Sequence, residues 1–131
     1  MPRAIFTACL CLCAALAFAQ GQATYQPQIG QAGKDVVWVP TPDRLITRML
    51  QMADTTEKDV VVDLGSGDGR IPIAAAKKFG ARSLGIEYEA DLVQLSIRSA
   101  AREGVADRVR FLRQDLFQTD LSEATVVTLY V

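Results

Sequence analysis

A run of valines ends in a turn with three glycines at alternate positions, and this stretch constrains the fold more than any other. It reads VVVDLGSGDGR and covers residues 60–70. A β-branched run with few polar residues is typical of a strand that is covered on both faces. Glycines directly after such a strand let the backbone turn sharply and come close to a ligand. The stretch therefore predicts a strand followed by a ligand-binding turn.

The rest of the chain alternates between helical and extended patterns. The first helix is expected to take Thr41 as its N-cap and Pro42 as its first residue, because both residue types favour those positions. Helices are expected at 42–53, 70–80 and 89–104, and strands at 59–64, 81–87, 107–115 and 125–131. This order predicts an α/β fold with a parallel sheet and right-handed crossovers.

The last expected strand ends at the last residue of the sequence. A hydrophobic strand at a sheet edge with nothing to cover it favours aggregation. We therefore expect residues 35–131 to be an incomplete domain whose carboxyl-terminal half is missing. Residues 20–34 are rich in Gln, Gly and Ala and are expected to form a flexible segment before it.

The first 19 residues, MPRAIFTACLCLCAALAFA, differ from the rest. One early basic residue, Arg3, precedes an apolar run that ends in Ala17-Phe18-Ala19, the pattern of a secretory signal peptide with its cleavage site. The apolar run is short for a membrane span. The leader predicts a secreted or periplasmic protein; the alternative is a cytosol-facing domain that an uncleaved leader attaches to a membrane.

Composition excludes several kinds of site. The chain has no histidine, which removes histidine metal ligands and a histidine base. All three cysteines, Cys9, Cys11 and Cys13, lie in the leader, so a processed chain would have neither a disulfide framework nor a thiolate nucleophile. The formal net charge is −1, and no long basic run supports a nucleic-acid partner. No metal site is predicted.

The ligand of the glycine turn can be narrowed by comparing motifs. A P-loop needs a lysine followed by serine or threonine at a fixed spacing, and neither is present. Gly65 and Gly67 fit a dinucleotide fingerprint, but Arg70 stands at its third glycine. Asp63 precedes the first glycine by two residues; its carboxylate would repel a pyrophosphate and attract an ammonium group. A ligand with a cationic end and no phosphate is favoured.

Two more acids are expected where successive strands end. Glu87 closes the second strand, 22 residues after Gly65, where it can accept hydrogen bonds from ribose hydroxyls. Asp115 closes the third strand, where it can accept from an adenine amino group while the N–H of Leu116 meets a ring nitrogen. Carboxyl ends of parallel strands share one edge of a sheet, and ligands bind there. The pattern predicts a nucleoside site and leaves the choice between NAD and another nucleoside open.

Three stretches carry a family resemblance: VVDLGSGDGR, GIEYEADL and FLRQDLFQTDLSEATVVTLYV. They are similar to the successive cofactor motifs of class I S-adenosylmethionine-dependent methyltransferases. The likeness is greatest to bacterial relatives of the seven-strand mitochondrial protein-lysine methyltransferases that act on the ATP synthase c-subunit and the adenine nucleotide translocase. It extends from about Val36 to Val131, and WVPTP resembles a short element that precedes the cofactor fold in that group.

The resemblance implies a Rossmann-like parallel sheet with about four of its seven strands present, and S-adenosylmethionine as cofactor. Asp63, Gly65, Gly67 and Gly69 would cradle the methionine part of the cofactor, with Asp63 near its ammonium group. Glu87 would hold the ribose, and Asp115 with Leu116 the adenine. By the same analogy Thr41 would help to cover the cofactor. The full predicted cofactor-binding set is Asp63, Gly65, Ser66, Gly67, Gly69, Glu87, Tyr88, Asp115 and Leu116.

The leading hypothesis is methyl transfer from the sulfonium by in-line displacement, with a protein lysine as the acceptor that the family suggests. Thr128 and Tyr130 lie near the expected acceptor site but are equally explained as ordinary strand residues, so no catalytic residue is assigned. The alternative is a non-catalytic nucleoside-cofactor-binding module, or a fragment that needs a partner chain. A dehydrogenase is the third hypothesis. The residues do not indicate an oligomeric state.

Overall fold

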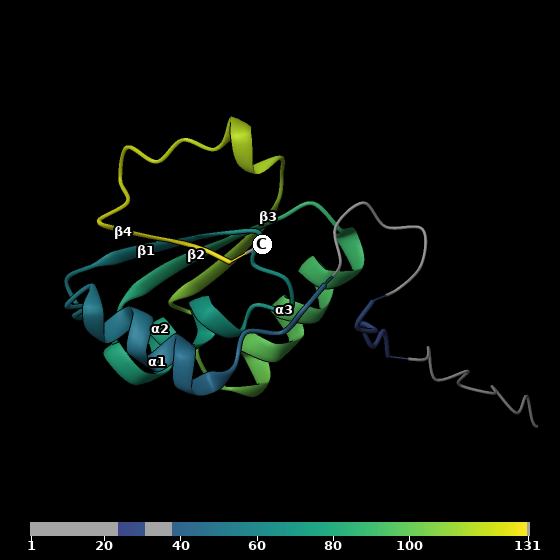
Figure 1. Ribbon diagram of the computed structural model, residues 1–131, viewed down its shortest axis with the longest axis horizontal. Coiled ribbons are helices and arrows are strands. Elements are labelled where there is room, and N and C mark those ends of the chain that lie inside the picture. Colours follow the sequence, from purple (N-terminus) through teal and green to yellow (C-terminus); the bar gives the residue numbers. More distant parts are fainter. Residues whose placement is uncertain (1–23, 31–37, 131) are drawn as a thin grey trace, which may run out of the picture.

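The computed structural model describes residues 24–30 and 38–130. The predicted leader, residues 1–19, and Val131 lie outside the described residues. Helices and strands alternate along the chain as expected (Figure 1): α1 Asp43–Met52, β1 Val60–Leu64, α2 Arg70–Phe79, β2 Arg82–Glu87, α3 Ala90–Arg102, β3 Val109–Arg113, the 3₁₀-helix η1 Leu116–Gln118 and β4 Val126–Leu129. None of the helices in the described part of the chain is long and apolar enough to span a membrane.

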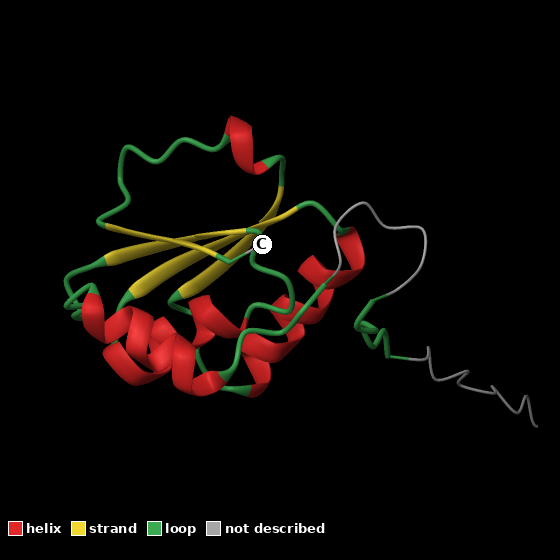
Figure 2. Cartoon of the chain, in the orientation of Figure 1, coloured by secondary structure: helices red, strands yellow, loops and turns green. Residues whose placement is uncertain are grey.

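The four strands form one parallel sheet in the order β3-β2-β1-β4. The α/β fold class with a parallel sheet is thereby confirmed. The three α-helices lie on one side of the sheet, and the connection that carries η1 lies on the other (Figure 2). The register pairs Asp63 of β1 with Gly85 of β2 on one side and with Thr128 of β4 on the other.

The core is divided by the sheet. On the helical side, Ile46 and Leu50 of α1 pack with Val61 and Ile71, and a second cluster joins α2, α3 and Phe111 of β3. On the other side, a smaller cluster is built on Val62, Leu64 and Ile86 and is partly covered by Leu116 and Ala124. The chain is therefore held together mainly through the helical face of the sheet.

The start of α1 differs from the prediction. Pro42 is the N-cap, in an extended conformation with φ −60° and ψ 138°, and its carbonyl accepts from the N–H groups of Leu45 and Ile46. Thr41 is therefore not the cap, and its side chain is buried. The prediction of Gly80 as the end of α2 is confirmed, since it adopts the left-handed conformation. The 3₁₀-helix η1 was not expected.

Candidate functional site

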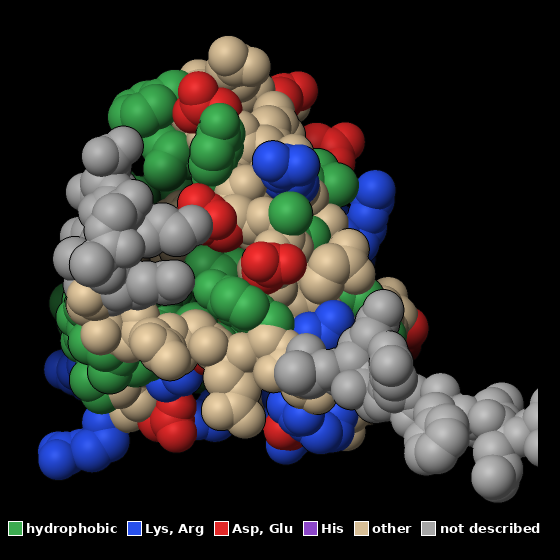
Figure 3. Space-filling view, turned by 90° about the vertical axis from the view of Figure 1, so that its right-hand side faces the viewer, with side chains coloured by type: hydrophobic (Ala, Val, Ile, Leu, Met, Phe, Trp, Pro, Cys, Tyr) green, Lys and Arg blue, Asp and Glu red, His purple; other side chains and the backbone are tan. Residues whose placement is uncertain are grey.

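A cavity of about 940 Å³ opens at the carboxyl ends of the strands. Because β1 lies between β2 and β4, the connections around it run in opposite directions, which is where ligands bind in open α/β sheets. The glycine turn, the segment before α1 and the residues after β2 and β3 line this cavity. Figure 3 shows this face of the molecule, with acidic side chains in its middle beside apolar ones.

The structure brings together eight of the nine residues predicted to bind the cofactor. Those that line the cavity are Asp63, Gly65, Ser66, Gly67, Glu87, Tyr88, Asp115 and Leu116. Gly69 is not among the described lining residues. It is the N-cap of α2, with φ 82°, and an added Cβ would lie 2.7 Å from the Phe111 ring and 2.8 Å from Ser96 Cβ. The absence of a side chain at position 69 is therefore explained by the packing of the turn against β3 and α3.

Gly67 brings the turn against the segment that precedes α1. Its φ is +55°, and an added Cβ would lie 2.9 Å from Nε1 of Trp38. A side chain at this position would strain the backbone and would also displace the indole. The Oγ hydroxyl of Ser96 in α3 lies 3.1 Å from the Gly67 carbonyl oxygen and 2.9 Å from the Leu92 carbonyl oxygen, so its one hydrogen is shared between them and ties the turn to α3. The turn is thus held between Trp38 and α3.

Asp63 is the most deeply buried acid of the cavity, with 1% of its surface exposed. Thr128 of β4 donates to its Oδ1 at 2.6 Å, whereas Oδ2 has no hydrogen-bond partner among the described residues. Burial raises the pKa of the Asp63 carboxyl to about 7; Thr128 opposes the rise, and the charges of Glu87 and Asp68 add to it. A buried acceptor without a partner is costly unless a ligand supplies the donor.

Glu87 joins the two loops that border the cavity. Its Oε2 accepts from the Gly67 N–H at 2.8 Å, and its Oε1 accepts from the Glu89 N–H at 2.9 Å. Both carboxylate oxygens are therefore fixed in place by backbone donors, and each keeps capacity for a further hydrogen bond. The geometry suits a group that presents two neighbouring hydroxyls.

The end of β3 supplies a more open wall. Asp115 caps η1, since its Oδ1 accepts from the Phe117 N–H at 2.9 Å. Leu116 packs against Val62, Leu64 and Ile86 on the face of the sheet opposite the helices. Tyr88 and Phe117 line the same part of the cavity and are 68% and 90% exposed. Exposed aromatic faces beside an acid form a surface on which a planar heterocycle can stack.

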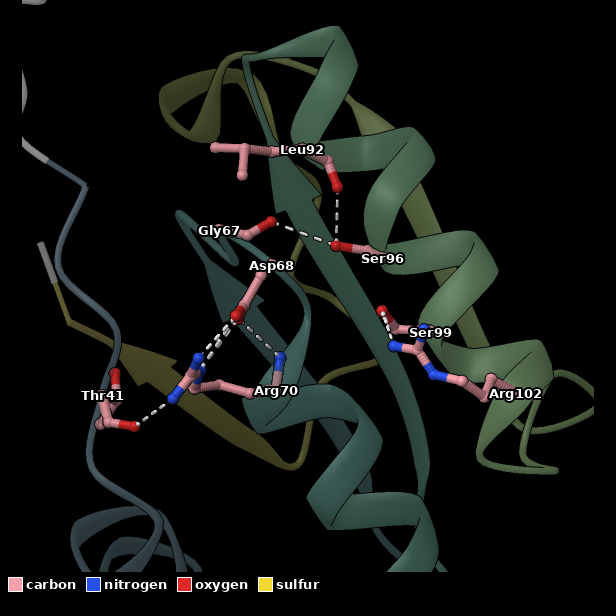
Figure 4. A network of polar contacts seen from close by, with 8 residues as sticks. All are labelled: Thr41, Gly67, Asp68, Arg70, Leu92, Ser96, Ser99 and Arg102. Atoms are coloured by element: carbon pink, nitrogen blue, oxygen red, sulfur yellow. Dashed lines mark hydrogen bonds and ion pairs between the residues drawn. The ribbon is translucent and has the colours of Figure 1, made fainter. Parts of the chain in front are cut away.

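An arginine joins the glycine turn to the segment before α1 (Figure 4). Arg70 Nη2 lies 2.6 Å from Asp68 Oδ2, and its Nε donates to Oδ1 of the same carboxylate at 3.0 Å. The remaining nitrogen, Nη1, donates to the Thr41 carbonyl at 3.2 Å. The hydrogen bond to Asp68 raises the pKa of Arg70, so the guanidinium stays charged.

The described lining of the cavity is acidic. Five carboxylates face a single arginine, and that arginine is paired: the acids are Asp63, Asp68, Glu87, Glu89 and Asp115. No group of three or more potential metal ligands was found in the part of the chain that the structure describes. The free Oδ2 of Asp63 and the fixed carboxylate of Glu87 fit the ammonium and ribose of the S-adenosylmethionine that the sequence resemblance implies.

Sequence reasoning missed the contacts that cross between distant segments. Thr128 was considered only as an acceptor-site or strand residue, and it proves to be the hydrogen-bond partner of Asp63. The sequence indicates no role for Trp38 beyond its place in the WVPTP segment, whereas in the structure its indole packs against Gly67. The signal that could have pointed to Trp38 is that it is the only tryptophan of the chain, placed just before a proline-rich entry to the first helix.

Comparison with known proteins finds relatives that are named as methyltransferases. The family described as the ANTKMT methyltransferase domain matches residues 63–131. A protein-lysine N-methyltransferase of Saccharolobus islandicus (strain REY15A) is 39% identical over 97 residues, which is 73% of this chain and 60% of that protein. The lysine N-methyltransferase of the ATP synthase c-subunit from Caenorhabditis elegans is 38% identical over 80 residues, 59% of this chain and 42% of that protein.

A solved structure is also similar. It is that of an RNA methyltransferase from Salinibacter ruber in complex with S-adenosyl-L-homocysteine, with a TM-score of 0.70 and 57% sequence identity. The match covers 71% of this chain and 61% of that one. The chain therefore spans 60% or less of the length of the two curated relatives named above, and a similar share of this structural neighbour.

Proposed function

This chain belongs to the family described as the ANTKMT methyltransferase domain, and we propose that the whole protein transfers a methyl group from S-adenosylmethionine to a lysine side chain of a protein. The resemblance to class I methyltransferases read from the sequence is thereby confirmed at the level of the family. The lysine acceptor is supported by the names of two relatives at 38–39% identity. The proposal rests on the acidic cavity and on its buried Asp63, whose Oδ2 has no hydrogen-bond partner among the described residues.

The proposed roles follow from what each residue can donate or accept. Asp63 Oδ2 accepts from the cofactor's ammonium group, and Glu87 accepts from the ribose hydroxyls. Asp115 and Leu116 contact the adenine, with Tyr88 beside it. Gly67 lets the turn approach Trp38 at the edge of the cavity because it carries no side chain. These assignments use only groups that line one cavity.

When bound, S-adenosylmethionine supplies a methyl group that its sulfonium has already activated. The chain's own contribution is alignment and removal of water, which can account for many orders of magnitude in rate. A lysine acceptor has to lose its proton before its nitrogen can accept the methyl group, because the ammonium form has no free electron pair.

RNA is the second candidate acceptor, because the Salinibacter ruber protein with 57% identity is described as an RNA methyltransferase. A protein acceptor is favoured because two curated relatives at 38–39% identity are named for lysine methylation. The chain has a formal net charge of −1, so it also lacks the excess of basic residues that binds a phosphate backbone.

The test supplies radiolabelled S-adenosylmethionine together with total protein or total RNA from the source cells. Label on protein, located on lysine by mass spectrometry, is expected, and Asp63→Ala should abolish it. Label on RNA alone would refute the lysine acceptor. Binding of S-adenosylhomocysteine without any transfer would favour the non-catalytic module, and preferential binding of NAD would favour a dehydrogenase.

A further inference from the structure

Residues 38–41, Trp-Val-Pro-Thr, are a short segment without regular secondary structure, here called the strap. All four line the cavity, together with the glycine turn on the facing side. At one end of the strap, the Trp38 indole lies so close to Gly67 that no side chain would fit between them. At the other end, Thr41 is buried and leads directly into α1. The strap and the glycine turn therefore line the same cavity as Asp63.

One guanidinium holds the strap to the turn. Arg70 reaches the Thr41 carbonyl with Nη1, across 29 residues of sequence, while Nε and Nη2 are occupied by Asp68. The side chains of Arg70 and Asp68 are 33% and 18% exposed, so the pair is partly screened from water. The contacts of Nε and Nη2 with Asp68 orient the planar guanidinium, and its third nitrogen, Nη1, points at the strap (Figure 4).

Helix stability does not explain an arginine at this position. Arg70 is the first residue of α2, where the helix dipole disfavours a positive charge, and the first turn contains no acidic residue. Asp68, just before the helix, compensates the charge, but a neutral residue would need no compensation. The contact that a neutral residue could not make is the charged hydrogen bond to the Thr41 carbonyl.

We propose that Arg70 and Asp68 are a positioning pair that keeps the strap closed over the bound cofactor and so sets how fast the cofactor leaves. This rests on the proposed function, because it takes S-adenosylmethionine as the occupant of the cavity. A contact that must break before a ligand can leave acts mainly on the dissociation rate. Loss of the pair therefore accelerates dissociation and changes association little.

Trp38 makes this testable without an activity assay, because it is the only tryptophan in the chain and lies on the strap. Quenching of its fluorescence by acrylamide measures how exposed the strap is, and stopped-flow mixing measures release of S-adenosylhomocysteine. Arg70→Met should increase quenching and speed release by about tenfold, the loss of one partly exposed charged hydrogen bond. Arg70→Lys, whose single ammonium cannot reproduce the fork, should be intermediate.

The matched control is Arg102→Met, which removes an arginine bonded to Ser99 of its own helix, α3. It should leave quenching and release unchanged. If the unsubstituted protein fails to bind S-adenosylhomocysteine, the proposed cofactor is wrong. If that protein binds and Arg70→Met changes neither quenching nor release, the positioning pair alone is refuted. Circular dichroism verifies folding, and Arg70→Lys serves as the test if Arg70→Met does not fold.

Discussion

Replacement of Asp63 by asparagine tests the electrostatic reasoning about the cavity most directly. The carboxyl is buried, its Oδ2 has no hydrogen-bond partner among the described residues, and burial raises its pKa to about 7. Near neutral pH the free protein therefore holds this carboxyl partly protonated. Only the ionised form attracts an ammonium group, so proton and ligand compete for the same oxygen.

The competition sets the size of the effect. Below the pKa, the apparent affinity falls about tenfold per pH unit, so the Kd for S-adenosylhomocysteine should be about tenfold larger at about pH 6 than at about pH 8. Asparagine does not titrate, so the same profile should be flat in Asp63→Asn, and its affinity should be weaker at about pH 8. Adenosine lacks the ammonium group and should give a flat profile with both proteins.

Ionisation of Asp63 favours ligand binding but lowers the stability of the free protein. The folded-state pKa of Asp63, about 7, lies above its ordinary value of 3.8, so the folded state binds the proton more tightly. The contribution of Asp63 is therefore most favourable below about pH 4, decreases as the pH rises, and is fully lost above about pH 7. A shift of about three pKa units corresponds to about 4 kcal/mol, so Asp63→Asn should stabilise the free protein at about pH 8 by about 1–3 kcal/mol after the cost of the buried amide.

Calorimetric titration with S-adenosylhomocysteine between about pH 6 and about pH 8 measures the change in affinity. Urea unfolding of the free proteins over the same pH range measures the change in stability. The reasoning predicts weaker binding and higher stability in Asp63→Asn. A variant that binds as tightly as the unsubstituted protein at about pH 8, or that keeps the pH dependence, would show that Asp63 does not face the ammonium group. A less stable variant would show that the carboxyl is not held under strain.

Three further substitutions test neighbouring contacts. Thr128→Val removes the hydrogen bond that favours ionised Asp63, so the inflection in the binding profile should move up by about one pH unit, and Thr128→Ser should restore it. Glu87→Gln should weaken adenosine and S-adenosylhomocysteine about equally, whereas loss of Asp63 should weaken only the latter in equilibrium titrations. Gly69→Ala combines a positive φ with a steric overlap and should lower the free energy of unfolding in urea by about 2–4 kcal/mol. The control, Gly104→Ala, has a positive φ but open space around it and should lower it by about 1 kcal/mol. Equal losses in the two variants would refute the overlap.

The sequence was sufficient for features that depend on local chemistry. The valine run and the glycines after it predicted β1 and its turn, and Gly80 predicted the end of α2, because left-handed glycine is a local preference. The start of α1 was missed by one residue, since Pro42 stays extended and caps the helix itself. The helix η1 was missed because its cap, Asp115, had been assigned only to the ligand. The grouping of acids at one sheet edge was predictable because parallel strands share their carboxyl ends.

What the sequence could not show depends on the order of the strands. Consecutive strands are usually neighbours, and that rule would place β4 beside β3. The observed order places β4 beside β1, and only then does Thr128 reach Asp63 across 65 residues. The same limit applies to Arg70, whose partner Thr41 lies 29 residues away on a segment with no regular structure. In both cases the residue that carries the charge could be recognised locally, as a buried acid or as a cation at the wrong end of a helix. Its partner could be found only in the folded chain, because local rules are broken at a site when a distant group compensates.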